Sequence, residues 1–335
     1  MKKLVPEYSF SAEQLHIISA LAEETGLTEQ IVRILYARGV DTAQKIAKFM
    51  RPSKKNFLNP FLMRGMREAV ELLTAARDEG KTVAVFGDYD ADGVCASAIM
   101  YHVLREFGIE AHIYVPERAD GYGLSIEVID RIFEECNPEV FITVDCGISC
   151  AEEAQYIYEL GSDVIITDHH ELPEVIPDCI VINPKLEDDY PYDNLCGAGV
   201  AIKLGCALIG EAAYKYLDFA TLATVADSVP LLGENRDIVT EGLKLFNTKL
   251  RSCFLHLMGG KIPEGGVMAQ TLAFNVAPRV NAAGRMGDAQ SAFHLFIAEK
   301  ETDIYELATK LCFYNTERQN CCDELYLSAK QKLLQ

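Results

Sequence analysis

Residues 82–108 read TVAVFGDYDADGVCASAIMYHVLREFG, and this stretch shows the unit from which the fold is built. A short apolar run ends in an acidic turn, and a segment with helical periodicity follows it. Such strand-like runs occur five times, at 82–87, 110–115, 139–144, 163–167 and 179–183. Helical patterns separate the first four runs, near 94–107, 125–135 and 151–160. This alternation predicts an α/β fold with a doubly wound, mostly parallel sheet.

Helical segments flank this alternating region on both sides. Residues 11–50 carry three helix-period patterns separated by turn signals, and 66–79 read as a further helix. After residue 197 the chain is mostly helical, apart from an irregular break rich in glycine and alanine that we predict at 275–290. The predicted parts are an N-terminal helical cap and linker (1–64), an α/β domain (65–300) and a long helix (301–335).

The composition fits a protein with a substantial core, since 49% of the 335 residues are apolar. No apolar run approaches the ~20 residues that a membrane helix needs, and the N-terminus lacks the apolar segment of a signal peptide. We therefore expect a cytoplasmic protein with no membrane partner. The eleven cysteines are scattered, without zinc-type spacing, and are expected to be reduced packing residues.

The charge of the chain limits how it can bind nucleic acid. Fifty acidic residues against 31 basic ones give a net charge of −19, whereas nucleic-acid binders usually carry a basic surface. This balance disfavours a large, sequence-independent DNA-binding surface. It is compatible with a local basic cleft, and bound cations would neutralise part of the negative charge.

Three of the predicted strands end in groups that bind cations. These groups are Asp88, Asp90 and Asp92 after the first strand, Asp145 after the third, and Asp168, His169 and His170 after the fourth. In an open parallel sheet, ligands bind beyond the carboxyl ends of the strands. Buried carboxylates without partners are costly, so their convergence predicts a site for divalent metal ions.

Other metal- and phosphate-binding motifs fail on inspection. The DYDADG turn resembles a calcium loop, but Ile99 stands where that loop needs glutamate, and a strand precedes the turn. Gly80-Lys81-Thr82 lacks the earlier glycine of a P-loop, because Ala75 stands there. Gly197-Ala198-Gly199 lacks the third glycine of a dinucleotide-binding loop.

Taken together, the motifs resemble those of the DHH phosphoesterase family. Asp-Tyr-Asp-Ala-Asp-Gly at 88–93, Thr-Val-Asp-Cys-Gly at 143–147 and Asp-His-His at 168–170 match its pattern, and LATVADSVPLLGENR (222–236) resembles its fourth motif. Four further blocks are similar to the RecJ-type branch: VPERADGYGLS (115–125), TDHHELPE (167–174), VINPK (181–185) and APRVNAAGRMGDA (277–289).

The resemblance implies a centre of two Mn²⁺ or Mg²⁺ ions. The implied metal ligands are Asp88, Asp90, Asp145, His169 and Asp227, and Asp145 is the implied bridge. His170 is the implied phosphate contact or proton donor, so Asp145, His169 and His170 are the catalytic candidates. Asp168 and Asp92 support the ligands, although Asp92 alone also fits a solvated turn. Many DHH proteins carry a histidine at the position of Ala84, but RecJ-type members do not. The lack of this histidine implies that one ion is held weakly or depends on substrate.

Candidate substrate contacts lie outside the metal motifs. Arg279, Asn281 and Arg285 recur in the predicted break, where small residues let the backbone approach a ligand and guanidinium groups can hold phosphate. The alternative is a plain surface loop. Arg118 and Tyr122 follow the second strand, and the tyrosine could stack on a base.

The resemblance implies a 5′→3′ exonuclease that acts on single-stranded DNA in repair or recombination. Two alternatives remain: a phosphodiesterase for short oligonucleotides or cyclic dinucleotides, which the acidic charge favours, and a non-catalytic RecJ-related scaffold. RecJ-like enzymes continue past the long helix into a DHHA1 domain with a Gly-Gly-His signature, which this sequence lacks. The implied partners are single-stranded DNA or short oligonucleotides, and a separate DHHA1-containing polypeptide or repair proteins.

Overall fold

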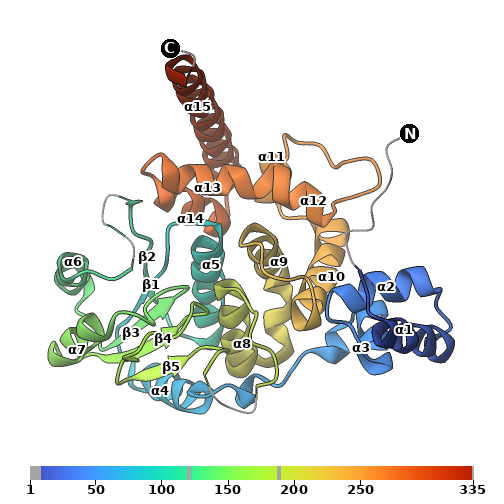
Figure 1. Ribbon diagram of the computed structural model, residues 1–335. Coiled ribbons are helices and arrows are strands. Elements are labelled where there is room, and N and C mark those ends of the chain that lie inside the picture. The colour runs from blue at the N-terminus through green and yellow to red at the C-terminus, as the bar shows by residue number, and fades with distance from the viewer. Residues whose placement is uncertain (1–8, 119–120, 122, 187–189, 334–335) are drawn as a thin grey trace. The chain divides into compact units, whose positions relative to one another are not determined.

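The computed structural model describes residues 9–118, 121, 123–186 and 190–333. The chain divides into two compact units, Met1–Asn56 and Phe57–Gln335, which are described separately. Figure 1 labels the helices and strands of both units.

The first unit contains the three helices predicted from the pattern of residues 11–50. They are α1 (Ala12–Thr25), α2 (Glu29–Ala37) and α3 (Ala43–Met50), followed by the short 3-10 helix η1 (Lys54–Asn56). Ser11 begins α1 with a capping box, in which its hydroxyl accepts from the Gln14 N–H at 3.2 Å. Ile18, Val32 and Ile46 are buried at the centre of this unit.

The second unit is built on the predicted parallel sheet, and all five strands are confirmed. They are β1 (Val83–Phe86), β2 (His112–Tyr114), β3 (Val140–Val144), β4 (Asp163–Thr167) and β5 (Ile180–Ile182). Their spatial order is β2-β1-β3-β4-β5, and every pairing is parallel. The chain moves outward from β1 to β2 and then returns to the far side of β1. The carboxyl ends of β1 and β3 therefore form the switch point at which such sheets bind ligands.

Helices cover both faces of the sheet, as a doubly wound fold requires (Figure 1). The helices around the sheet are α4 (Met66–Glu79), α5 (Ala91–Phe107), α6 (Ile126–Cys136), α7 (Ala151–Glu159) and α8 (Gly197–Ile209). Side chains alternate along β1: Val83 and Val85 join the core that includes α5 and α8, whereas Ala84 and Phe86 join the core that includes α6 and α7. All four residues of this strand are buried, which explains its continuous apolar run.

The remaining elements of this unit are helical. They are η2 (Pro60–Leu62), η4 (Gly210–Tyr216), α9 (Leu217–Ala226), α10 (Gly233–Thr248), α11 (Ser252–Leu257), α12 (Ala269–Thr271), η5 (Leu272–Val276), α13 (Ala277–Arg285), α14 (Ala289–Ile297) and α15 (Glu301–Leu333). The stretch Gly197–Ala226 is long and apolar enough to cross a membrane, by length and composition only. The mean hydropathy of its most apolar window is 1.2. This stretch consists of α8, η4 and α9, and 56% of its most apolar window is buried in the protein, so packing in the core accounts for its composition.

The predicted irregular break at 275–290 was wrong, because most of it is the helix α13. Ala277, Ala282 and Ala283 favour a helix, and Pro278 lies in the first turn, where a missing N–H costs little. A π-helical turn, η5, precedes α13, and Gly287 at φ +78° ends the turn that follows it. The predicted long helix at the end of the chain is present as α15.

Candidate metal centre

The DYDADG turn after β1 is held in shape by its own side chains. Asp90 caps the start of α5, since its side chain accepts from the N–H groups of Asp92 at 2.8 Å and Gly93 at 3.1 Å. A Cβ on Gly93 would overlap the backbone of Asp88, so glycine is required where the helix turns back over the strand end. The turn thereby holds Asp88 and Asp90 at the carboxyl edge of the sheet.

Asp145, directly after β3, lies in an unusual local environment. Its backbone has φ +62°, a left-handed conformation that aspartate tolerates better than most residues but that still costs about 1–3 kcal/mol. The residue is 2% exposed, and its Oδ1 accepts no hydrogen bond within the described part of the chain. Helix α8 begins against it, and a Cβ on Gly197 would overlap this carboxylate. A strained, buried and unsatisfied carboxylate indicates a site for a ligand that is not part of the protein.

His169, after β4, faces Asp145 with its ring nitrogen Nε2. Nε2 lies 3.1 Å from Asp145 Oδ1 and 3.9 Å from Asp227 Oδ2. Burial, together with the neighbouring His170, lowers the pKa of His169 to about 4, so the ring is neutral at pH 7 and offers a lone pair. Adjacent ligands of an octahedral ion with bonds of about 2.1 Å lie about 3 Å apart, close to the separation seen here.

The candidate ligand atoms converge in three groups, within each of which they lie within 4.8 Å of one another. The groups are Asp88, Asp90 and Asp145; Asp145, His169 and His170; and Asp92, His169 and Asp227. The structure therefore brings together all five ligands that the resemblance implied. Asp145 and His169 each belong to two groups, which places them between the others.

Crowded, buried carboxylates raise one another's pKa in this centre. Burial raises the pKa of Asp88 to about 7, and the nearby Asp90 adds to the shift. Burial also raises the pKa of Asp145 well above its ordinary value and that of Asp227 to a smaller extent, again with contributions from neighbouring carboxylates. Metal ions would relieve this repulsion, and a set of carboxylates with one imidazole suits Mn²⁺ or Mg²⁺.

Comparison with known proteins agrees with this geometry. The DHH family, N-terminal domain, matches residues 82–226. Single-stranded-DNA-specific exonuclease RecJ of Bacillus subtilis is 38% identical over 314 residues, which cover 92% of this chain and 40% of that protein. A crystal structure of exonuclease RecJ bound to manganese matches with a TM-score of 0.74 and 35% identity, over 80% of this chain and 70% of that one. The chain belongs to the RecJ-like DHH family.

A second solved structure supports the same assignment. RecJ from Thermus thermophilus in complex with Mn²⁺ matches with a TM-score of 0.77 and 30% identity, over 94% of this chain and 46% of that one. A further RecJ structure from that organism contains Mg²⁺. The chain spans about half or less of the length of the curated RecJ proteins it matches, 40% for those of B. subtilis and T. thermophilus. It is a DHH phosphoesterase with a candidate Asp/His metal site.

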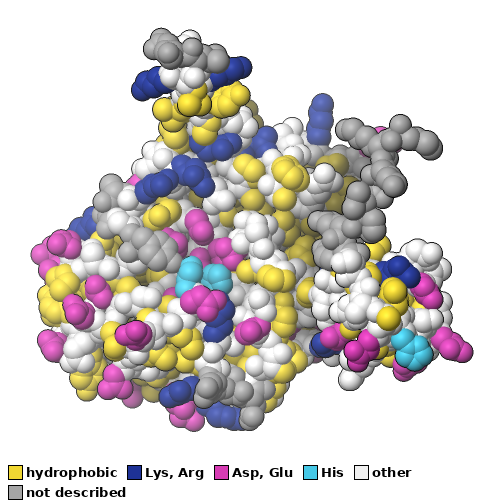
Figure 2. Space-filling model, in the orientation of Figure 1, with side chains coloured by type: hydrophobic (Ala, Val, Ile, Leu, Met, Phe, Trp, Pro, Cys, Tyr) yellow, Lys and Arg dark blue, Asp and Glu magenta, His cyan; other side chains and the backbone are white. Residues whose placement is uncertain are grey.

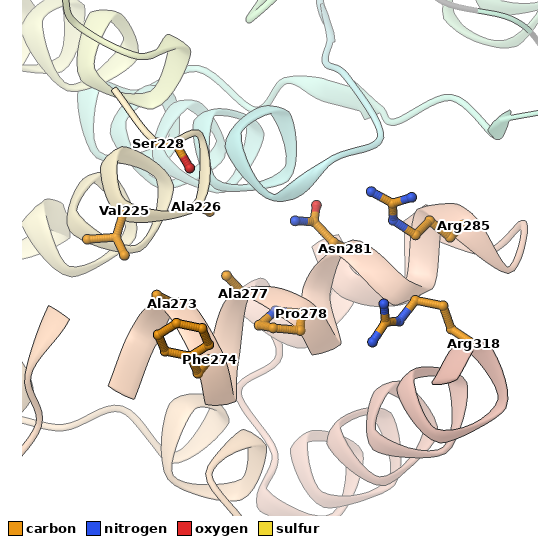
Figure 3. A pocket seen from close by; sticks show the side chains of 10 residues that line it. All are labelled: Val225, Ala226, Ser228, Ala273, Phe274, Ala277, Pro278, Asn281, Arg285 and Arg318. Atoms are coloured by element: carbon orange, nitrogen blue, oxygen red, sulfur yellow. The ribbon is translucent and has the colours of Figure 1, made fainter. Parts of the chain in front are cut away.

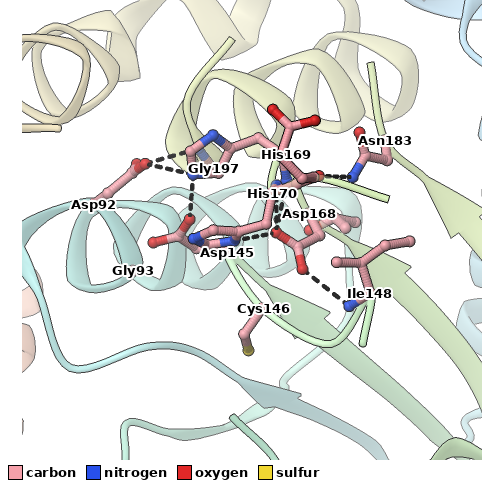
Figure 4. A network of polar contacts seen from close by, with 12 residues as sticks. Asp92, Gly93, Asp145, Cys146, Ile148, Asp168, His169, His170, Asn183 and Gly197 are labelled. Carbon is pink, nitrogen blue, oxygen red and sulfur yellow. Dashed lines mark hydrogen bonds and ion pairs between the residues drawn. The ribbon is translucent and has the colours of Figure 1, made fainter. Parts of the chain in front are cut away.

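Asp168, the first residue of the DHH motif, holds the two histidines that follow it (Figure 4). One of its oxygens accepts from the backbone N–H groups of His169 at 2.6 Å and His170 at 3.1 Å, and lies 2.7 Å from Nδ1 of His170. The other accepts from the Ile148 N–H at 2.9 Å. Burial opposes ionisation of Asp168, but the hydrogen bond and charge of His170 lower its pKa. The same hydrogen bond raises the pKa of His170.

Asp92 is likewise a supporting residue and not a solvated turn. Its buried carboxylate accepts from the N–H groups of Gly197 and Ala198, both at 2.7 Å, and its Oδ2 lies 3.7 Å from His169 Nε2 (Figure 4). Burial and the charge of Asp90 raise the pKa of Asp92 to about 8. Asp92 thus ties the start of α5 to the start of α8, and so holds α8 against Asp145.

The predicted substrate contacts fall into different places. Asn281 accepts from the Ala91 N–H at 2.8 Å, so its side-chain oxygen supports the ligand turn and is not available to a substrate. Arg279 donates to the backbone oxygen of Asn275. Arg118 is exposed, and Tyr122 lies outside the described residues.

Arg285 and Asn281 line a pocket of about 370 Å³ beside the metal centre (Figure 3). Two further residues of this pocket, Phe274 and Arg318, were missed by the sequence analysis. Their surroundings in the sequence carry no motif that was recognised, and they come together only through the packing of α13 against α15. In Figure 2, histidine and acidic side chains lie together on one face, with Lys and Arg side chains nearby.

Proposed function

We propose that this protein hydrolyses phosphodiester bonds in single-stranded DNA, as a 5′→3′ exonuclease that uses two Mn²⁺ or Mg²⁺ ions. The observation that carries the proposal is the buried Oδ1 of Asp145, which accepts no hydrogen bond from the described residues and lies 3.1 Å from the neutral Nε2 of His169. A carboxylate oxygen and a neutral imidazole nitrogen at this separation are suited to share a cation. The curated relatives of this chain are named single-stranded-DNA-specific exonucleases, which supports the substrate.

In this proposal, each ligand lies at the end of a strand of the sheet or, for Asp227, at the end of helix α9. Asp88 and Asp90 would hold one ion from the turn after β1, and His169 and Asp227 would hold the other from the ends of β4 and α9. Asp145 lies between the two groups and would contribute to both. When bound, the ions would supply Lewis-acid activation of water and neutralise the charge that develops on the phosphate.

His170 is the proposed contact to the phosphate. Asp168 fixes its ring through Nδ1 and stabilises the protonated form. A protonated imidazole beside the metal centre can donate a hydrogen bond to a phosphate oxygen or a proton to the leaving oxygen. Because His170 is partly exposed, a substrate can reach it.

The net charge favours a second candidate, a phosphodiesterase for short oligonucleotides or cyclic dinucleotides. A chain of charge −19 gains little from long-range attraction to a polyanion, whereas a short substrate needs few backbone contacts. A non-catalytic scaffold is less well supported, because the structure brings the five implied ligands and both histidines together. For the second candidate, efficient digestion of long strands would need a DHHA1-containing partner or repair proteins, as the resemblance implies.

The test is a time course of hydrolysis by the purified chain, with Mn²⁺ or Mg²⁺ and with chelator. The substrates are end-labelled single-stranded DNA, single-stranded RNA of the same sequence, a dinucleotide and a cyclic dinucleotide. Release of mononucleotides from the 5′ end of DNA supports the proposal, and hydrolysis of only the two smallest substrates supports the second candidate. Asp163→Asn is the matched control for Asp145→Asn, since Asp163 is exposed at the opposite edge of the same sheet.

A further inference from the structure

We infer that the pocket in Figure 3 holds a nucleotide of the single strand next to the metal centre, with its base on Phe274 and a phosphate on Arg318. This inference rests on the proposed function and extends it, because it assigns a binding site to residues outside the recognised motifs. It concerns the strand beyond the bond that is cut.

The pocket adjoins the metal centre through two elements. Ala226 and Ser228 line it from the end of α9, and the residue between them is the metal ligand candidate Asp227. Asn281 lines it from α13 and accepts from the Ala91 N–H in the turn that carries Asp88 and Asp90. A strand with a phosphate at the metal centre therefore meets this pocket within its neighbouring nucleotides.

Phe274 offers a flat apolar surface to such a strand. It is 72% exposed, although the rest of the apolar surface of η5 is largely buried, including Leu272 and Val276. Single exposed aromatic residues are common and need no explanation by themselves. This one lies on a π-helical turn, a feature that often marks functional sites, and it lines a pocket that also contains guanidinium groups. Stacking on such a ring is the usual way in which proteins hold the bases of single strands.

Two arginines bring positive charge to this pocket in a chain that is acidic overall. Neither Arg285 nor Arg318 forms an ion pair among the residues that the structure describes, in a protein of charge −19. Arg318 donates to Asn315 Oδ1 at 3.2 Å through one terminal nitrogen, while its buried Nε has no partner in the described chain. Figure 3 shows both arginines at one end of the pocket and Phe274 at the other, with Pro278 between them. A nucleotide likewise presents its phosphate and its base at separate ends.

The lining also predicts how specific this site is. The side-chain oxygen of Asn281 is already engaged with Ala91, and the other contacts are a ring, guanidinium groups, small apolar side chains and the single hydroxyl of Ser228. Stacking and phosphate contacts are tolerant of sequence, because every base has a flat face and every nucleotide a phosphate. The site should therefore hold all four bases with similar affinity.

The experiment measures binding of fluorescent oligothymidylates of about ten nucleotides by anisotropy, without divalent metal, at two salt concentrations. Phe274→Ala and Phe274→Leu should weaken binding by about 5- to 100-fold, while Phe274→Tyr should retain it, because only an aromatic ring stacks. Arg318→Gln should weaken binding and lower the slope of log affinity against log salt by about one. The matched controls are Tyr158→Ala and Arg77→Gln, at exposed positions on α7 and α4.

The outcomes separate this inference from the proposed function. If the wild-type chain degrades single strands, but the Phe274 and Arg318 variants bind with its affinity and salt slope, the nucleotide site is overturned and the proposed function stands. If the wild-type chain cleaves no single strand with any divalent metal, the proposed function fails first. An unchanged Mn²⁺-dependent rise in the melting temperature of each variant shows that a loss of binding does not come from damage to the metal centre.

Discussion

Two clusters of buried charge in the second unit differ in how their charges are satisfied. In one, Glu234 is 1% exposed and accepts from Lys203 Nζ at 2.7 Å, from the Leu58 N–H at 2.9 Å and from the Tyr190 hydroxyl. In the other, Asp145 is similarly buried but has a carboxylate oxygen that accepts nothing from the described residues. The first cluster is complete as protein, and it fixes the segment around Leu58 to α8 and α10. The second offers electron-pair donors that a cation would satisfy, which is why it is the candidate functional site.

Asp145→Asn should separate the two clusters most strongly. Asparagine keeps the shape of the side chain and tolerates the left-handed backbone, but it removes the charge that is proposed to bridge the ions. We expect turnover to fall by about 10³-fold or more, since the ions supply several kcal/mol of stabilisation to the transition state. The Mn²⁺-dependent rise in melting temperature should largely disappear, while the metal-free protein should be as stable as wild type or more so, because like charges are relieved.

Calorimetry with and without Mn²⁺ tests this, and Asp163→Asn should behave as wild type. An unchanged Mn²⁺ response in Asp145→Asn would contradict the bridging role.

Lys203→Met should lower the stability of the fold and leave Mn²⁺ binding unchanged, the opposite of what we expect for Asp145→Asn. It leaves Glu234 buried without its cation, which typically costs about 3–5 kcal/mol of folding free energy. The folded fraction should still bind Mn²⁺ as wild type does, because this cluster contains none of the metal ligands. Lys244→Met is the matched control: the Lys244 side chain is 61% exposed where it pairs with Glu241, and ion pairs at the surface contribute about 0–1 kcal/mol.

Urea denaturation of both variants measures the difference in free energy of unfolding. Similar values for Lys203→Met and Lys244→Met would show that the first cluster is not a structural ion pair.

His170→Gln tests the chemistry at the edge of the metal centre. If His170 contacts phosphate or donates a proton, turnover should fall by ~10²–10⁴, with values near the lower end because the ring is partly exposed. Metal content should remain close to wild type, since Asp88, Asp90, Asp145, His169 and Asp227 are intact. Elemental analysis of the purified variant, beside single-turnover kinetics, separates the two roles. A loss of metal from this variant would make His170 a ligand instead.

Much of this contrast could be predicted from the sequence, because it depends on local patterns. Apolar runs of the right length predicted all five strands, and parallel strands necessarily bring their carboxyl ends to one edge. The acids and histidines that follow β1, β3 and β4 therefore had to lie close together. The roles of the individual ligands came from the resemblance to DHH proteins, and they remain predictions until they are tested.

The parts that could not be predicted depend on contacts between distant segments. Asp92 looks like any residue of an acidic turn until its hydrogen bonds to Gly197 and Ala198 are seen. Asn281 was predicted to contact substrate, yet its oxygen accepts from Ala91, 190 residues away along the chain. The glycines near α13 suggested a break, although alanine content and packing against the ligand turn produce a helix. The sequence likewise could not predict that Phe274 and Arg318 line one pocket, because they lie on two different helices, η5 and α15.

The smallest expected effect is the dependence of stability on pH, which distinguishes the two clusters without mutation. Burial raises the pKa of Asp88 to about 7 and that of Asp92 to about 8, so the folded metal-free protein holds protons that the unfolded chain has released. Stability should therefore fall as pH rises through these values. The raised pKa of His170 acts in the same direction, whereas the lowered pKa of His169 acts in the opposite direction and only below the ordinary histidine value of about 6.5.

Between about pH 6.5 and 8 we expect the melting temperature of the metal-free protein to fall by a few degrees. Mn²⁺ or Mg²⁺ should stabilise most at the upper end of this range, since ligands must lose protons to bind. Thermal scans at several pH values, with chelator and with Mg²⁺, test both statements. A melting temperature that rises with pH in chelator would show that the carboxylates of the centre are not protonated as the structure indicates.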